Sequence, residues 1–235
     1  MRVVIGVIAF VTITFGLDVP SSLNIYKKNV GQNEKYITVA VVFDQTVSTQ
    51  ANLQSDAGEW IEDVFYEAQK KLSNELQITI KFEITHIEVA SNALSAEIKR
   101  RTVWGQMHGP TIVNAVIEDY KKSLNPDVLC VITKDKFYYG PSSNDLGFSS
   151  YSTLCERVVP ILLTFDWDTQ DNVEGTATLF SSLVRSSINY GKLRSTGVNK
   201  EYFDNCNIRY KPKGSTHEDD YLVLPINKDY YDYEY

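Results

Sequence analysis

The feature that most constrains the fold is an alternation of strand-like and helix-like segments between residues 36 and 190. Four segments have the apolar, β-branched or alternating pattern of strands: 36–47, 77–89, 127–133 and 158–165. Three others place apolar residues three and four apart, as on one face of a helix: 58–72, 110–125 and 174–190. In the first helix the predicted buried face is Trp60, Ile61, Val64, Phe65, Ala68 and Leu72. This order predicts an α/β fold, with a mixed, mostly parallel twisted sheet and flanking helices.

The composition is that of one ordinary folded domain and excludes several classes of protein. The 235 residues are 43% hydrophobic, which supplies a sizeable core and excludes an intrinsically disordered chain. With 23 Lys and Arg against 30 Asp and Glu, the formal net charge is -7. Without a basic surplus to neutralise phosphates, we expect no nucleic-acid partner. The chain has 3 His residues, which limits metal chemistry, and we expect no cofactor.

The first 17 residues have the pattern of a secretory signal peptide. Arg2 precedes an apolar run that ends near Gly16 and Leu17. The run is shorter than the roughly 20 residues of a membrane span, and no second such run follows. We therefore expect a secreted, extracellular protein without a membrane partner, an uncleaved anchor being the alternative. The predicted organisation is a signal peptide (1–17), an N-terminal segment (18–35), an α/β domain (36–210) and a flexible tail (211–235).

In an oxidising compartment the three cysteines predict one disulfide and one free thiol. Cys130 lies in an apolar run that resembles a central strand, where a cysteine behaves as a small hydrophobic residue. Cys155 and Cys206 follow more polar segments, so we predict a Cys155–Cys206 disulfide. Pairing of Cys130 with another chain is the alternative.

Three segments in sequence order resemble one protein family. Residues 127–135 are similar to the segment that enters that family's fourth strand. Residues 147–155 have the length and spacing of its nine-residue G-x-A-Y-x-G-x-x-C motif. Residues 176–185 fall where the family has A-T-x-A-H-E-L-x-H. Over residues 36–210 the chain thus resembles the reprolysin-type metalloproteases, which are metzincins. Within that family, the general character of the sequence is most similar to that of the secreted tick salivary members. The resemblance implies a metzincin-like catalytic-domain fold with a shortened lower subdomain.

The resemblance also shows what this chain lacks. A metzincin needs H-E-x-x-H-x-x-G-x-x-H, in which three His residues bind zinc and the Glu polarises a water. The corresponding positions here are Ser181, Ser182, Arg185, Ile188 and Gly191. None offers an imidazole, and Arg185 would place a permanent cation in the position of the metal. The three His residues are isolated from one another: His86, His108 and His217.

The degenerate helix implies a pseudoenzyme that has lost zinc and peptidase activity. The alternative is a secreted peptidase of divergent mechanism, with Ser181 or Ser182 as its nucleophile. No G-x-S-x-G elbow frames either serine, so a solvated serine on a helix face is the simpler interpretation.

Two charged clusters have structural interpretations. The acids before the third helix are predicted to cap it and to complement its dipole: Asp166, Asp168, Asp171 and Glu174. A Ca²⁺ site is the alternative, although the spacing is not that of an EF-hand loop. Residues 99–102 resemble a dibasic processing point, but a solvated helix face or end is the prediction there.

Residues 217–235 form an acidic tail interleaved with tyrosines. Six acids against Lys228 give a net charge of -5, and five of the 15 tyrosines lie here. Tyrosine beside an acid in a flexible secreted segment resembles a sulfation site. Such a strip suits an Arg- and Lys-rich groove, whereas a disordered solubilising tail is the alternative. The predicted binding residues are Tyr221, Tyr230, Tyr231, Tyr233, Tyr235, Asp229, Asp232 and Glu234.

The sequence therefore predicts a secreted, catalytically inactive, monomeric metalloprotease-like salivary effector. Its expected partner is a host extracellular protein with a basic surface, such as a chemokine, a thrombin-type exosite or another haemostasis or immune factor. A secreted structural or glandular protein without a host target is a third interpretation.

Overall fold

A computed structural model describes the backbone of the folded body and the side chains of most of it. The described backbone comprises residues 24–27, 33–121, 126–195, 199–206, 208–211 and 222–223, and the described side chains are those of 33–121, 126–194 and 201–206. The predicted signal peptide, and all the predicted binding residues of the tail, lie outside the described residues. No helix within the described part is long and apolar enough to cross a membrane.

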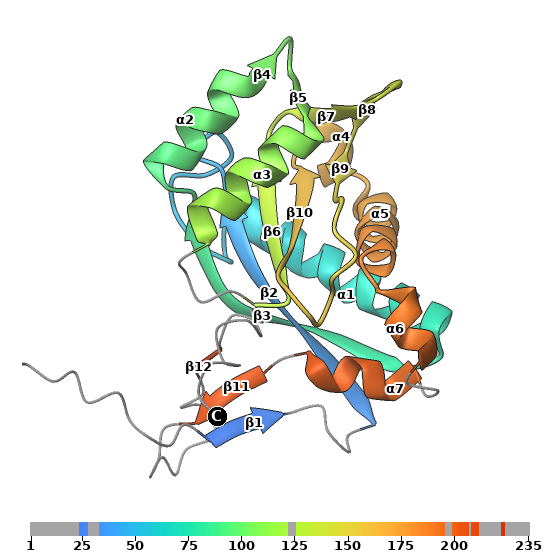
Figure 1. The fold of residues 1–235 in the computed structure, drawn as a ribbon. Helices are drawn as coiled ribbons and strands as arrows, with labels where there is room; N and C mark the ends of the chain where they lie inside the picture. The colour runs from blue at the N-terminus through green and yellow to red at the C-terminus, as the bar shows by residue number, and fades with distance from the viewer. Residues whose placement is uncertain are drawn as a thin grey trace, which may run out of the picture.

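A five-stranded sheet with the order β3-β2-β6-β10-β9 forms the centre of the molecule (Figure 1). The strands are β2 (Glu34–Phe43), β3 (Thr79–Val89), β6 (Val128–Thr133), β9 (Gly147–Phe148) and β10 (Val159–Thr164). The first four in this order are parallel, and β9 pairs antiparallel with β10 at the edge. This confirms the predicted mixed, mostly parallel sheet.

Helices cover both faces of this sheet, as predicted. One face is covered by α1 (Asp56–Leu76) and α5 (Val173–Ser186), and the other by α2 (Asn92–Arg101) and α3 (Gly109–Tyr120) (Figure 1). Side chains alternate along β2, so Val39 and Val41 enter the core under α1 and α5, whereas Ala40 and Val42 enter the other core.

Helix α1 shows why these segments fold as they do. Ser55 caps its first turn by accepting a hydrogen bond from the Gly58 amide at 3.2 Å, and Gln77 ends it in the left-handed conformation. The predicted apolar face is buried in full: Trp60, Ile61, Val64, Phe65, Ala68 and Leu72. Burying this face against the sheet and α5 is the main source of the helix's stability.

Helix α2 was not among the three predicted helices, apart from the helix end expected at residues 99–102. Helix α5 stops at Ser186, four residues before the predicted end, although Ile188 remains buried beyond it. The chain then forms three short helical segments: α6 (Tyr190–Ser195), α7 (Asn199–Tyr202) and a 3₁₀ turn (Phe203–Asn205). Helix α4 (Trp167–Gln170) is a single turn before α5.

Two small sheets lie at opposite ends of the molecule (Figure 1). One has the order β4-β5-β7-β8: β4 (Thr102–Val103), β5 (Gln106–His108), β7 (Lys136–Tyr139) and β8 (Ser142–Asp145). The other has the order β1-β11-β12: β1 (Asn24–Lys27), β11 (Ile208–Lys211) and β12 (Leu222–Val223). Neither sheet was predicted from the sequence, because strands of two to four residues are too short to show a period of two. Strand β12 lies within residues 211–235, which were predicted to be a flexible tail, and it pairs with β11.

The predicted Cys155–Cys206 disulfide is present, and it joins the segment after β9 to the end of the 3₁₀ turn. Cys130 is a free, buried thiol on β6, as the apolar run around it indicated. Burial raises the pKa of the Cys130 thiol, so it behaves as a small core hydrophobe.

Candidate functional site

The positions at which the resemblance requires zinc ligands lie on α5 and just beyond it. Ser181 is 1% exposed in the core between α5 and the sheet, and its hydroxyl has no hydrogen-bond partner among the described residues. Ser182 is half-buried. Arg185 is exposed and directs its guanidinium to α1, where Nη1 lies 3.1 Å from the Glu75 carboxylate. Gly191 is exposed in α6. The structure therefore does not direct these side chains toward one point.

The described residues do not fit a zinc ion. In that part of the chain, one group of three has ligand atoms within 4.8 Å of one another: Asp127, Cys155 and Cys206. The two cysteines form the disulfide, so neither offers a thiolate. The Asp127 carboxylate accepts hydrogen bonds from the Thr38 amide at 2.8 Å and the Thr38 hydroxyl at 2.7 Å. This buried group holds β2 to the start of β6.

The prediction that the acids before the third helix cap it is wrong except for the helix dipole: the N-cap of α5 is Asn172, and of the four acids only Glu174 lies in its first turn. Asp166 is the N-cap of α4 in a reciprocal capping box with Thr169. Lys136 on β7 lies 3.4 Å from the Asp166 carboxylate and 3.1 Å from that of Asp168, and its hydrogen bond to Asp168 is the main reason for its raised pKa. Glu174, in the first turn of α5, pairs with Lys71 of α1 at 3.1 Å. These contacts explain the acids without a Ca²⁺ ion.

The basic residues that resembled a processing point form the last turn of α2. Arg100 and Arg101 each lie 2.7 Å from the Glu97 carboxylate. The hydrogen bond from Arg100, followed by the one from Arg101, lowers the pKa of Glu97. The prediction of a solvated helix end is therefore correct.

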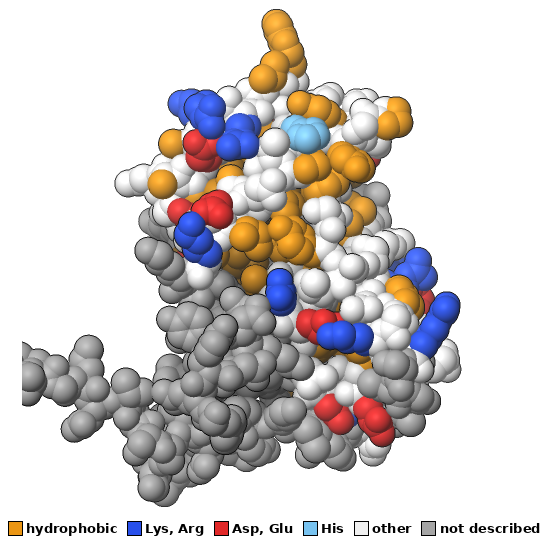
Figure 2. Space-filling model, in the orientation of Figure 1, with side chains coloured by type: hydrophobic (Ala, Val, Ile, Leu, Met, Phe, Trp, Pro, Cys, Tyr) orange, Lys and Arg blue, Asp and Glu red, His pale blue; other side chains and the backbone are white. Residues whose placement is uncertain are grey.

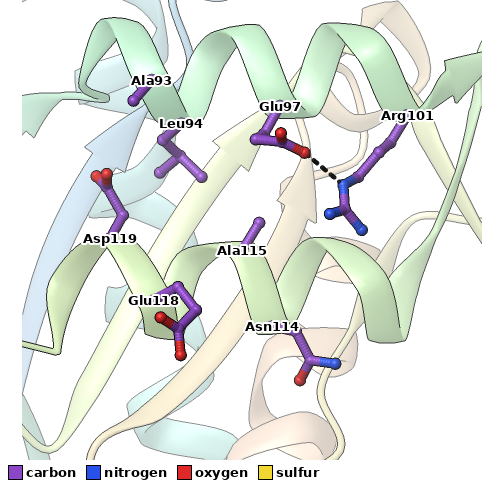
Figure 3. A pocket seen from close by; sticks show the side chains of 8 residues that line it. All are labelled: Ala93, Leu94, Glu97, Arg101, Asn114, Ala115, Glu118 and Asp119. Atoms are coloured by element: carbon purple, nitrogen blue, oxygen red, sulfur yellow. Dashed lines mark hydrogen bonds and ion pairs between the residues drawn. The ribbon is translucent and has the colours of Figure 1, made fainter.

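A shallow groove of about 380 Å³ runs between α2 and α3 (Figure 3). Its lining combines small apolar side chains with charged ones: Ala93, Leu94, Glu97, Arg101, Asn114, Ala115, Glu118 and Asp119. The acids already have partners, since Glu97 pairs with Arg101, Glu118 with Lys121 and Asp119 with the Ser91 hydroxyl. The groove therefore has the shape of a site but offers no poised acid–base pair.

The most exposed apolar side chains gather where the parallel strands end at their carboxyl termini. Of seven large hydrophobic residues exposed in the described part, five lie on the β4–β5 turn, on β7 and on α4: Val103, Trp104, Tyr138, Tyr139 and Trp167. The His108 ring lies 5.2 Å from that of Tyr138, which extends this aromatic surface along β5 and β7. This surface was not predicted from the sequence, in which the single Gly105 is the one indication of a turn here.

Lys136 connects the two turns that carry the exposed tryptophans. Its backbone amide donates to the Gly105 carbonyl at 3.2 Å, next to Trp104. Its ammonium binds the carboxylates on both sides of Trp167. In contrast, the third tryptophan, Trp60, is buried and donates its indole N–H to the Thr169 carbonyl at 2.9 Å. One tryptophan thus supports the fold, whereas the other two project from it.

No family model and no curated protein matches this chain. The archaemetzincin of Methanopyrus kandleri is similar in structure, with a TM-score of 0.39 and 13% identity over 65% of this chain and 73% of that one. Metalloproteinase-II of Bacteroides fragilis has a TM-score of 0.33 and 11% identity over 55% of this chain and 37% of that one. An Argonaute of Aquifex aeolicus has a TM-score of 0.27 and 15% identity over 79% of this chain and 21% of that one.

Proposed function

We propose that this protein is a secreted, catalytically inactive relative of the reprolysin-type metalloproteases that acts by binding a basic host protein. The observation that carries the proposal is the identity of the residues on α5. Where the family needs His, Glu and His, this chain has Ser181, Ser182 and Arg185. A guanidinium has five N–H donors, no lone pair for a metal and a charge that it keeps at any physiological pH. That charge instead forms an exposed ion pair with Glu75 of α1.

The divergent-hydrolase alternative has less physical support. A serine nucleophile needs a neighbouring base and access to the substrate. Ser181 is almost fully buried among apolar side chains, and Ser182 lies next to it on a helix without a nucleophile elbow. A binding function needs neither a base beside a serine nor a serine that is accessible to a substrate.

The proposed binding element is the tail, with Tyr221, Tyr230, Tyr231, Tyr233 and Tyr235 among acids that include Asp229, Asp232 and Glu234. Its charge of -5 over residues 217–235 would steer a basic partner, and its rings would bury apolar area on contact. Sulfation would add permanent negative charge to those rings. The proposed partner class is a chemokine, a thrombin-type exosite or a related haemostasis or immune factor, met by a monomeric salivary effector. The pattern at 1–17 and the disulfide support secretion.

The test combines composition, activity and binding of the secreted full chain. Intact-mass spectrometry should show one disulfide, loss of the first 17 residues and added steps of about 80 Da from sulfate. Metal analysis should find no stoichiometric zinc, and gelatin and fibrinogen should remain uncut with or without a chelator. Basic proteins should be retained from host plasma by the full chain and lost when residues 217–235 are removed.

A matched variant separates the tail from the helix. A chain with Ser181→Ala, Ser182→Ala and Arg185→Ala should retain the plasma proteins that the tail truncation loses. Stoichiometric zinc with chelator-sensitive cleavage would overturn the proposal, as would binding that depends on α5 and is indifferent to the tail.

A further inference from the structure

The β4–β5 hairpin presents a tryptophan in an unfavourable conformation. Val103 pairs with Gln106, so the connecting loop is the two residues Trp104 and Gly105. Their φ angles are 53° and 72°, as in a type I′ turn, whose first position suits Asn, Asp or Gly. A left-handed conformation costs a bulky residue about 1–2 kcal/mol because its Cβ approaches the backbone carbonyl. Local structure therefore disfavours tryptophan at position 104.

Packing does not compensate for this cost. Trp104 is 97% exposed and Val103 is 59% exposed, so neither gains by leaving water. Figure 1 places the β4–β5 hairpin at the extreme top of the molecule, and Figure 2 shows hydrophobic side chains projecting alone at that place. A strained, fully exposed tryptophan at the tip of a projecting hairpin has no role in stabilising this fold, which points to a function outside it.

The charge behind the tip is positive. The last turn of α2 carries Lys99, Arg100 and Arg101 directly before β4. Glu97 is the one acid among residues 97–104, so this segment has a net charge of +2. Figure 2 shows Lys and Arg side chains gathered over α2, beside the projecting tip. Trp167, the other exposed tryptophan, has flanking residues of the opposite charge, since it lies between Asp166 and Asp168.

Shape and charge together favour one class of partner. A specific protein interface needs about 800 Å² on each side with its aromatic residues in the middle of a patch, whereas this tip is narrow and convex. The indole ring prefers the interface between lipid headgroups and acyl chains, which a convex tip enters readily. Basic residues beside such an anchor are attracted to anionic headgroups.

We propose that the β4–β5 hairpin makes a peripheral contact with anionic phospholipid membranes. Trp104 and Val103 enter the headgroup layer, while Lys99 and Arg100 remain at the level of the lipid phosphates. The sequence-based expectation of no membrane partner rested on the lack of a spanning segment, and a peripheral contact needs none. The proposal does not involve the tail residues proposed as the binding element, and β12, the described strand within residues 217–235, lies at the opposite end of the molecule from the β4–β5 hairpin (Figure 1).

The experiment measures binding of the full secreted chain to vesicles of phosphatidylcholine with or without phosphatidylserine. In a Trp167→Phe background, the remaining tryptophans are Trp60, which is 5% exposed, and Trp104. A shift of the emission to shorter wavelength on adding vesicles therefore reports Trp104 entering a less polar layer. We expect this shift with phosphatidylserine vesicles, reversal by high salt, and binding about fivefold weaker for each of Lys99→Gln and Arg100→Gln.

Trp104→Ser should weaken vesicle co-sedimentation at least about tenfold, by removing the ring from the interface. The matched control is Trp167→Ser, which removes a tryptophan that is 84% exposed beside two acids and should leave co-sedimentation unchanged. Circular dichroism should show both variants folded, since neither side chain is buried. Equal binding to neutral vesicles, unchanged binding of Trp104→Ser, or an absence of any emission shift would each overturn the proposal.

Discussion

The two helical layers of this molecule differ in how completely they are packed. Between the sheet and α1 and α5, aromatic rings interlock, with Phe180 lying 4.7 Å from Phe65 and 5.2 Å from Phe82 between centroids. The α2 and α3 layer buries only Leu94 and Ile98 from α2, and an open groove of about 380 Å³ separates its two helices. The layer that contains Ser181, Ser182 and Arg185 is therefore the more tightly packed of the two. The looser layer leads directly into the exposed hairpin.

Phe180→Ala should have the largest effect among the substitutions that probe this contrast. Truncating a buried aromatic ring costs about 3–5 kcal/mol, and the rings of Phe65 and Phe82 would both lose a neighbour. Leu94→Ala on the other layer should cost about 2 kcal/mol, because Leu94 lines the open groove and water can fill the space. Urea unfolding of both variants measures the difference. Equal losses of stability would contradict the comparison.

Thr38→Val should have the next largest effect and tests the polar link at the centre of the sheet. The substitution removes a hydroxyl that donates to the buried Asp127 carboxylate at 2.7 Å and accepts from the Asp127 amide at 3.0 Å. Leaving a buried carboxyl group with one donor fewer costs about 1–3 kcal/mol. Thr178→Val is the control, since the Thr178 hydroxyl bonds the Glu174 carbonyl on the exposed face of α5. A change of the same size in both would show that Asp127 gains nothing from Thr38.

The free energy of unfolding above pH 8 tests the burial of Tyr202, which packs into the same core as α1 and α5. Burial raises the pKa of Tyr202 from 10.0 to about 12, while its hydroxyl donates to the Leu154 carbonyl at 2.5 Å. The unfolded chain thus releases this proton at lower pH than the folded one. The stability that Tyr202 contributes is complete below pH 10 and falls as the pH rises toward 12.

Tyr202→Phe removes this titration, so the free energy of unfolding should decline less steeply above pH 10 than in the unmodified chain. At neutral pH the variant should be less stable by about 1 kcal/mol, because the Leu154 carbonyl loses its donor. Urea unfolding between pH 8 and the onset of alkaline denaturation measures both effects. An unchanged slope would show that Tyr202 titrates equally in both states.

Trp104→Asn should have the smallest effect on stability, and in the favourable direction. Asn adopts the left-handed conformation more easily, and the lost ring is exposed, so a gain of up to about 1 kcal/mol is expected. Thermal unfolding measures it. A destabilisation of more than about 1 kcal/mol would mean that the indole packs against the body in solution.

The sequence predicted the elements whose pattern reflects their burial. Each apolar residue assigned to the buried face of α1 is buried, and on α5 the same holds for Ala177, Phe180 and Val184. The reason is physical: these helices pack one face against the apolar sheet, so apolar residues recur with the helical period, although Leu183 at the border of the face of α5 is only half-buried. Cys155 and Cys206 were also paired correctly, because few alternatives existed among three cysteines.

The features that the sequence did not predict depend on contacts between distant residues or on single turns. Arg185 could be placed on α5, but its partner Glu75 lies 110 residues earlier, and no local pattern links them. The β4–β5 hairpin has strands of two and three residues, and its loop uses Trp-Gly instead of the common Asn-Gly. The tail binding residues lie outside the described part and remain a prediction.

The parallel order of the sheet also determines when it can form during synthesis. Its pairings join residues far apart, since Ile37 lies opposite Phe82 and Val39 opposite Val128. A ribosome that releases the chain from its N-terminus therefore completes β2, α1 and β3 as a first unit, while the other edge of β2 waits for β6. Cys206 emerges later still, so the disulfide can close only on a sheet whose five strands have all been made. The disulfide therefore cannot guide the order in which the central strands are synthesised, and it can only close around segments that already exist.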